Sequence, residues 1–91
     1  MPAPPRPGAA MCRLADGRLL AVGGLLDAKS SRFVDVYDQV GNGWEPIREL
    51  SHERAHAAAV ELPDGSVLVL GGHAHDGSED KLVASIERLR F

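Results

Sequence analysis

The chain has 91 residues, of which 44% are hydrophobic and 25% charged, a composition typical of one small folded domain rather than of a disordered segment. Its net charge is −3 and no basic stripe is present, which argues against nucleic-acid binding and polybasic membrane attachment. No apolar run approaches the roughly 20 residues of a transmembrane helix. The proline-rich start lacks the apolar stretch of a secretory signal, so a cytoplasmic location is slightly favoured.

Beyond a proline-rich tail at residues 1–5, the chain repeats itself. Arg6 aligns with Arg54 and Gly17 aligns with Gly65, each pair 48 positions apart, and no gap is needed over the matched segment. A fixed period of this length indicates a repeat architecture in which each copy is one supersecondary unit.

The first copy predicts four short strands in chain order. They cover residues 9–14, 18–22, 33–37 and 44–50, and a polar loop is expected over 25–32. The first two strands are joined at Asp16-Gly17, because glycine takes the positive φ that a tight reversal requires.

The second copy predicts three strands, over residues 57–62, 66–70 and 84–89. A turn at Pro63-Asp64-Gly65 joins the first two, and a polar loop is expected over 73–82. Val34 aligns with Ile86 at an offset of 52, so copy two has four more residues than copy one between its glycine pair and its third strand. No fourth strand is predicted before the chain stops at Phe91.

These features resemble the kelch repeat. The residues that carry the resemblance are the double glycines that end the second strands and an aromatic pair separated by six residues, namely Gly23, Gly24, Gly71, Gly72, Tyr37 and Trp44. Copy two departs from the pattern, with Leu89 where the tyrosine is expected. The resemblance implies an all-β fold of two β-propeller blades, with repeat 1 at residues 6–50 and an incomplete repeat 2 at 51–91.

Two blades leave apolar outer faces uncovered, because propellers close with about four to eight blades. Three arrangements satisfy this requirement: self-assembly, for instance of three copies into six blades; a piece of a longer kelch protein; or another chain that supplies the missing blades. The missing fourth strand favours the piece of a longer protein.

The loops at one end of the predicted sheets gather a candidate binding surface for a protein or another ligand. Its residues are His52, Arg54, His73, His75 and Asp76. A rigid sheet that presents such loops is a usual seat of recognition. A solvated polar loop is the alternative for His73 to Asp76, and no metal site or other cofactor is expected, because a third firm ligand is lacking.

Several other residues are interpreted as structural. Arg6 and Arg54 share one repeat position, which predicts a repeated hydrogen bond to a neighbouring loop or to an acidic residue, such as Asp35 or Glu87 at the matched third-strand positions. Tyr37 and Trp44 are expected to pack between blades. His56 is expected to pack or hydrogen-bond within the inner strand, and Cys12 to lie in the core.

The sequence therefore predicts a kelch-type binding module that is not an enzyme and whose partner is a protein or further copies of itself. Two alternatives stay open. In the first, the chain is a non-catalytic fragment of a larger enzyme of the galactose oxidase type. In the second, it is a self-assembling propeller unit. A copper site in such an enzyme needs tyrosine and histidine ligands, and Tyr37 already has a structural interpretation here.

Overall fold

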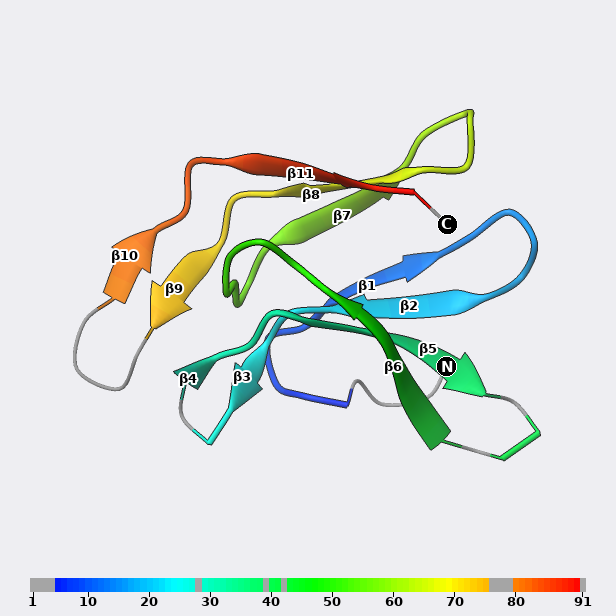
Figure 1. Ribbon diagram of the computed structural model, residues 1–91, viewed down its shortest axis with the longest axis horizontal. Helices are drawn as coiled ribbons and strands as arrows, with labels where there is room; N and C mark the ends of the chain where they lie inside the picture. The colour runs from blue at the N-terminus through cyan, green and yellow to red at the C-terminus, as the bar shows by residue number, and fades with distance from the viewer. Residues whose placement is uncertain (1–4, 28, 39, 42, 76–79, 91) are drawn as a thin grey trace.

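A computed structural model describes residues 5–27, 29–38, 40–41, 43–75 and 80–90. Every element in these segments is a β-strand (Figure 1). The strands are β1 (Ala10–Arg13), β2 (Leu19–Val22), β3 (Leu25–Leu26), β4 (Lys29–Ser30), β5 (Phe33–Asp38), β6 (Gly43–Glu49), β7 (Ala58–Glu61), β8 (Val67–Leu70), β9 (His73–His75), β10 (Asp80–Leu82) and β11 (Ile86–Leu89). The described segments contain no helix that could cross a membrane.

The first large sheet, sheet 1, has four antiparallel strands in the order β1-β2-β5-β6. A tight turn joins β1 to β2, with Gly17 at a φ of 94° and the Asp16 carboxylate accepting the Arg18 N–H at 3.0 Å. The Leu14 N–H closes the turn on the Arg18 carbonyl at 2.8 Å. The predicted Asp-Gly turn is thus present, and its glycine adopts the positive φ on which the prediction depended.

The second large sheet, sheet 2, has three antiparallel strands in the order β11-β8-β7. Its turn repeats the first, with Gly65 at a φ of 87° and the Leu62 N–H bonded to the Ser66 carbonyl at 2.7 Å. The order of the strands along the chain and their antiparallel pairing confirm the all-β prediction.

The two polar loops predicted after the glycine pairs are not simple loops. Each contains a short antiparallel hairpin, β3–β4 in the first copy and β9–β10 in the second. These strands have only two or three residues each, too few for the alternation of polar and apolar residues that identifies a strand in a sequence.

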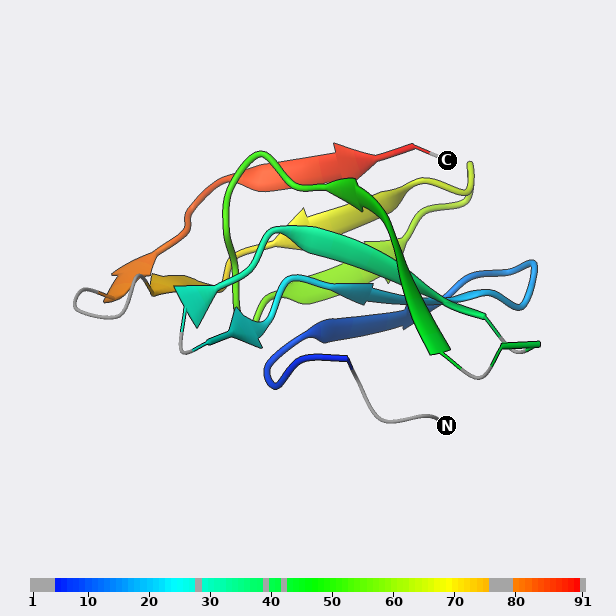
Figure 2. The same ribbon diagram turned by 60° about the horizontal axis from the view of Figure 1, so that its bottom comes forward.

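The two large sheets stack face to face over a shared core (Figure 2). Strand pairing places Cys12, Leu20 and Val36 side by side on sheet 1, facing the sheet 2 residues Val67, Val69 and Leu89 in one cluster. Cys12 is therefore a core residue, as predicted. This face-to-face packing of antiparallel sheets is that of neighbouring β-propeller blades, and the two sheets do not close into a ring.

Candidate functional site

One end of the molecule carries both short hairpins and the segment that connects the two large sheets (Figure 1). We call this end the rim and define it as residues 25–27, 29–32, 51–55, 73–75 and 80–82. The Ser30 hydroxyl donates to the His73 carbonyl at 3.0 Å and accepts the His75 N–H at 2.7 Å. Ala55 forms a further β-bridge with His73. These contacts join the loops of both copies into one surface.

The rim brings the three histidines predicted for the site to the same end of the molecule. The Nδ1 atom of His73 lies 3.3 Å from the Asp80 carboxylate, and that of His52 lies 4.0 Å from the Glu87 carboxylate. The His52 side chain is 62% exposed and that of His73 is 43% exposed, so both imidazoles are accessible to a partner. His75 follows on the same side of β9 and is half-buried. Asp76 lies outside the described residues.

Arg54 also belongs to this end, but its side chain is fully buried. Its guanidinium donates to the Gly71 carbonyl at 3.1 Å, the Ser85 carbonyl at 2.6 Å and the Ser85 hydroxyl at 2.8 Å. It also pairs with the Glu87 carboxylate at 3.2 Å. Arg54 therefore supports the rim from inside the molecule. A partner bound at the surface would contact the residues around Arg54 and not its guanidinium.

Glu87 is the partly buried counter-charge in this cluster. Burial alone would raise the pKa of Glu87, but the Ser51 N–H at 2.7 Å, the Arg54 guanidinium and the His52 N–H at 3.3 Å hold that pKa below its ordinary value. The carboxylate thus stays ionised and anchors the first residues of the connecting segment.

The first copy repeats this ion pair. Arg6 pairs with Asp35 at 3.0 Å and donates through Nε to the Gly23 carbonyl at 2.6 Å, and both charged side chains are buried. The predicted repeated hydrogen bond is confirmed, because each arginine pairs with the matched third-strand acid and also donates to the carbonyl of Gly23 or Gly71.

The interpretation of His56 as part of the inner strand is wrong. His56 is exposed and precedes β7, and its φ of 58° is in the left-handed region, outside strand geometry. Its N–H donates to the Gly8 carbonyl at 2.8 Å, so it connects the N-terminal segment to the second copy.

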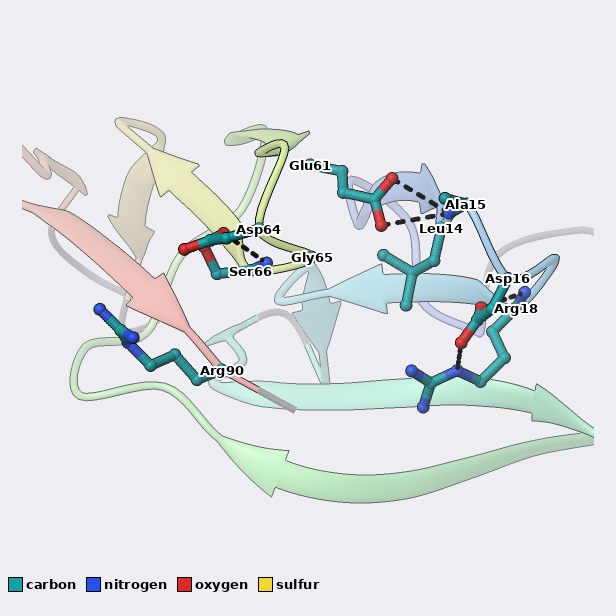
Figure 3. A pocket seen from close by; sticks show the side chains of 9 residues that line it. All are labelled: Leu14, Ala15, Asp16, Arg18, Glu61, Asp64, Gly65, Ser66 and Arg90. Carbon is teal, nitrogen blue, oxygen red and sulfur yellow. Dashed lines mark hydrogen bonds and ion pairs between the residues drawn. The ribbon is translucent and has the colours of Figure 1, made fainter.

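A cavity of about 480 Å³ lies at the opposite end, between the two strand turns (Figure 3). Its lining residues are Leu14, Ala15, Asp16, Arg18, Glu61, Asp64, Gly65, Ser66 and Arg90. No motif in the sequence indicated this cavity, because it forms only when the turns of the two copies come together.

The carboxylates of this cavity are already occupied. Glu61 accepts the Ala15 N–H at 3.0 Å, which ties sheet 2 to the turn of sheet 1. Hydrogen bonds from the Ser66 hydroxyl and N–H, together with the charge and hydrogen bond of Arg88, lower the pKa of Asp64 to about 2. These groups brace the turns, so the cavity offers no unengaged acid for general acid–base chemistry.

The described residues also bring together little that would support metal or nucleophilic chemistry. They contain no group of three His, Cys, Asp or Glu side chains placed to hold a metal ion. Tyr37 packs edge-on against Trp44, with ring centroids 5.3 Å apart, within sheet 1. Burial, followed by the nearby charge of Glu61, raises the pKa of Cys12 and keeps it a thiol.

Comparison with known proteins finds two relatives of limited extent. The chain is 39% identical over 70 residues to the aldehyde oxidase GLOX of Vitis pseudoreticulata, a match that covers 72% of this chain and 13% of that protein. It is 46% identical over 37 residues to tRNA wybutosine-synthesizing protein 4 of Saccharomyces cerevisiae, which covers 41% of this chain and 5% of that protein. No protein-family model matches the chain. The chain is thus similar to a small part of each of these two larger proteins.

Proposed function

We propose that this chain is a two-blade segment of a kelch-type β-propeller whose rim binds a protein partner. The observation that carries the proposal is the Ser30 bridge, which fixes loops from both copies as a single exposed surface above two buried arginine–acid pairs. A surface held in this way loses little conformational entropy when it binds, which favours recognition.

The kelch assignment is supported by the repeat and by the similarity to two larger proteins. Each copy ends its second strand in two glycines with positive φ and buries an arginine against a third-strand acid. Segments of this kind act as scaffolds in proteins of several functions, so the binding role rests on the rim and not on the fold.

Capture of partners with matched variants tests this function. The rim variant replaces His52, His73 and His75 by alanine, and the control variant replaces Val40 and Glu45, which are exposed at the opposite end. Proteins that bind the wild-type chain and the control, but not the rim variant, are expected. If the rim variant retains every partner of the wild type, the proposal is wrong.

A second candidate function is that of a non-catalytic part of an oxidase, and the similarity to an aldehyde oxidase over 72% of the chain favours it. Copper of the galactose oxidase type needs tyrosine and histidine together. Tyr37 is packed against Trp44 in sheet 1, whereas His52, His73 and His75 belong to the rim, so the described residues do not fit that metal. In such an enzyme this chain would contribute scaffold only.

A further inference from the structure

Sheet 2 has an apolar face that no other described part of the chain covers. This open face consists of Ala58, Val60, Leu68, Leu70 and Ile86, which the strand pairing aligns across β7, β8 and β11. Val60 is 48% exposed and Ile86 is 62% exposed. The repeat equivalents of these two residues, Cys12 and Val34, are 9% and 0% exposed.

The difference between the two sheets has a simple cause. In sheet 1 the equivalent face is covered by the opposite face of sheet 2, which consists of Ala59, Val67, Val69 and Leu89. We call this second kind of surface the covering face. The same repeat positions in sheet 1, namely Met11, Leu19, Ala21 and Tyr37, form a covering face as well. Met11 and Tyr37 are half-buried there, while Leu19 and Ala21 are already buried.

The chain therefore carries an open face at one end of the stack and a covering face at the other. We propose that a second copy of this chain docks head to tail, with the covering face of its sheet 1 on the open face of sheet 2. The contact would repeat, between two molecules, the contact that sheet 1 and sheet 2 already make within one.

A difference between two repeated glycines, Gly23 and Gly71, supports the docking of a second copy. Gly23 and Gly71 have nearly the same φ, 65° and 66°. A Cβ on Gly23 would lie 2.2 Å from the Arg54 carbonyl oxygen, whereas a Cβ on Gly71 would meet nothing within 4 Å. The space beside Gly71 is the place that an arginine of the next sheet would fill, and Arg6 of a second copy is the repeat equivalent of Arg54.

A backbone hydrogen bond shows the same difference between the internal contact and the open face. The Gly24 N–H donates to the Arg54 carbonyl at 2.7 Å, and Gly72 is its repeat equivalent. Within the described residues no acceptor is found for the Gly72 N–H. Among the described residues the Arg6 carbonyl accepts one bond, from Ala9 at 3.3 Å, which leaves a lone pair for a second copy.

The charges at the turn end also match a second copy. Within the chain, Glu61 accepts the N–H of Ala15. At the proposed contact the equivalent of Ala15 is Pro63, which has no N–H to donate, and the equivalent of Glu61 is Arg13. The exposed Arg13 of a second copy would instead face the turn that carries the ionised Asp64. On the open side the donor N–H of Ala15 is replaced by Pro63, and on the covering side the acceptor Glu61 is replaced by the donor Arg13.

Contacts between unlike faces propagate until they close, so this docking produces a ring or an open filament rather than a two-fold dimer. The three histidines replaced in the rim variant lie outside both faces, so partner binding at the rim and self-association can fail independently. The covered apolar area and the Gly71 contact favour assembly in solution.

The first experiment measures the solution mass of the full chain by light scattering over a range of concentrations. The wild type is expected to exceed the 9.7 kDa of one copy and to approach a fixed multiple of it. Gly71→Ala is expected to remain at one copy, because the new methyl group occupies the site of the Arg6 carbonyl.

Gly65→Ala is the matched control. Gly65 also has a positive φ, 87°, and open space within 4 Å, but its equivalent Gly17 touches nothing at the internal contact either. The control therefore carries similar backbone strain and is expected to assemble like the wild type. Circular dichroism establishes that each variant is folded. A folded wild type that stays a monomer, because another partner normally covers the open face, overturns the proposal.

A mixing experiment tests the direction of docking. Ile86→Asp blocks the open face and Met11→Asp blocks the covering face, so each variant alone is expected to be monomeric. Their mixture is expected to form a dimer, because each retains the face that the other lacks. Val40→Asp, which replaces another exposed apolar residue outside both faces, is expected to assemble normally. If the mixture stays monomeric while the wild type assembles, head-to-tail docking is wrong.

Discussion

Arg54 has the largest side chain that the described part of this fold buries completely. Its guanidinium makes four hydrogen bonds while its Nε atom finds no acceptor there, and its counter-charge is the partly buried Glu87. Removing one member of such a pair leaves a buried charge without its partner, a change that typically costs about 3–5 kcal/mol. The connecting segment between the sheets thus depends on an ion pair that is repeated in the first copy by Arg6 and Asp35.

Replacing Glu87 by glutamine tests the pair through its pH dependence. The pKa of Glu87 is below its ordinary value of 4.5, so the ionised carboxylate stabilises the folded state fully above that value. This stabilisation is lost as the pH falls through the lower folded-state pKa. Glutamine keeps the shape of the side chain and one acceptor oxygen, so Glu87→Gln is expected to cost less than complete removal of the partner and to lower the free energy of unfolding at pH 7 by about 1–3 kcal/mol. The difference from the wild type should shrink on acidification.

Denaturant unfolding of the two proteins at several pH values between neutrality and about pH 3 measures this difference. Glu53→Gln, at an exposed position on the same connecting segment, is the control and should follow the wild-type curve. A Glu87→Gln deficit that stays constant across the whole pH range would show that the charge of Glu87 contributes nothing.

At the scale of single elements, the sequence predicts the long strands better than the short ones. The strands that form the two large sheets follow from runs of apolar residues between Asp-Gly turns, which are local signals. The β3–β4 and β9–β10 hairpins depend on a contact between distant segments, the Ser30 bridge to His73 and His75, which no local pattern reveals.

The candidate site likewise combines features that local sequence patterns predict with features that depend on contacts between distant residues. Strand topology alone placed His52, His73 and His75 at one end of the molecule. The burial of Arg54 and the exposure of His56 depend on packing against Ser85 and against Gly8, respectively, 31 and 48 positions away along the chain. The cavity between the turns likewise requires both copies to be folded against each other.

Ser30→Ala is expected to loosen the rim without loosening the large sheets. The hydroxyl accepts the His75 N–H at 2.7 Å, so hydrogen exchange at the His75 amide should become faster, while amides in β2 and β8 keep their protection. Ser31→Ala is a close control, because the Ser31 hydroxyl accepts the Phe33 N–H instead and does not bridge the hairpins. Unchanged exchange at His75 in Ser30→Ala would mean that the bridge does not hold the rim together.

At the scale of the whole molecule, the core belongs to neither sheet alone. The buried cluster combines Val22 and Val34 of sheet 1 with Val67, Val69 and Leu89 of sheet 2. One apolar face of each sheet is buried by the other sheet. Separation of the two sheets would therefore expose both of these faces at once. The described molecule should therefore unfold as a single cooperative unit and not one copy at a time.

Val34→Ala tests this cooperativity from one side of the core. Val34 is fully buried, and loss of its methyl groups together with the resulting cavity is expected to destabilise the fold by about 2 kcal/mol. If the two sheets share one transition, amides in β8 should lose as much protection from hydrogen exchange as amides in β2. Val40→Ala changes the same residue type at a position that is 95% exposed and should leave both strands unaffected. Loss of protection confined to sheet 1 would mean that the copies unfold separately, because a shared core transmits the loss of packing at Val34 directly to Val67 and Val69.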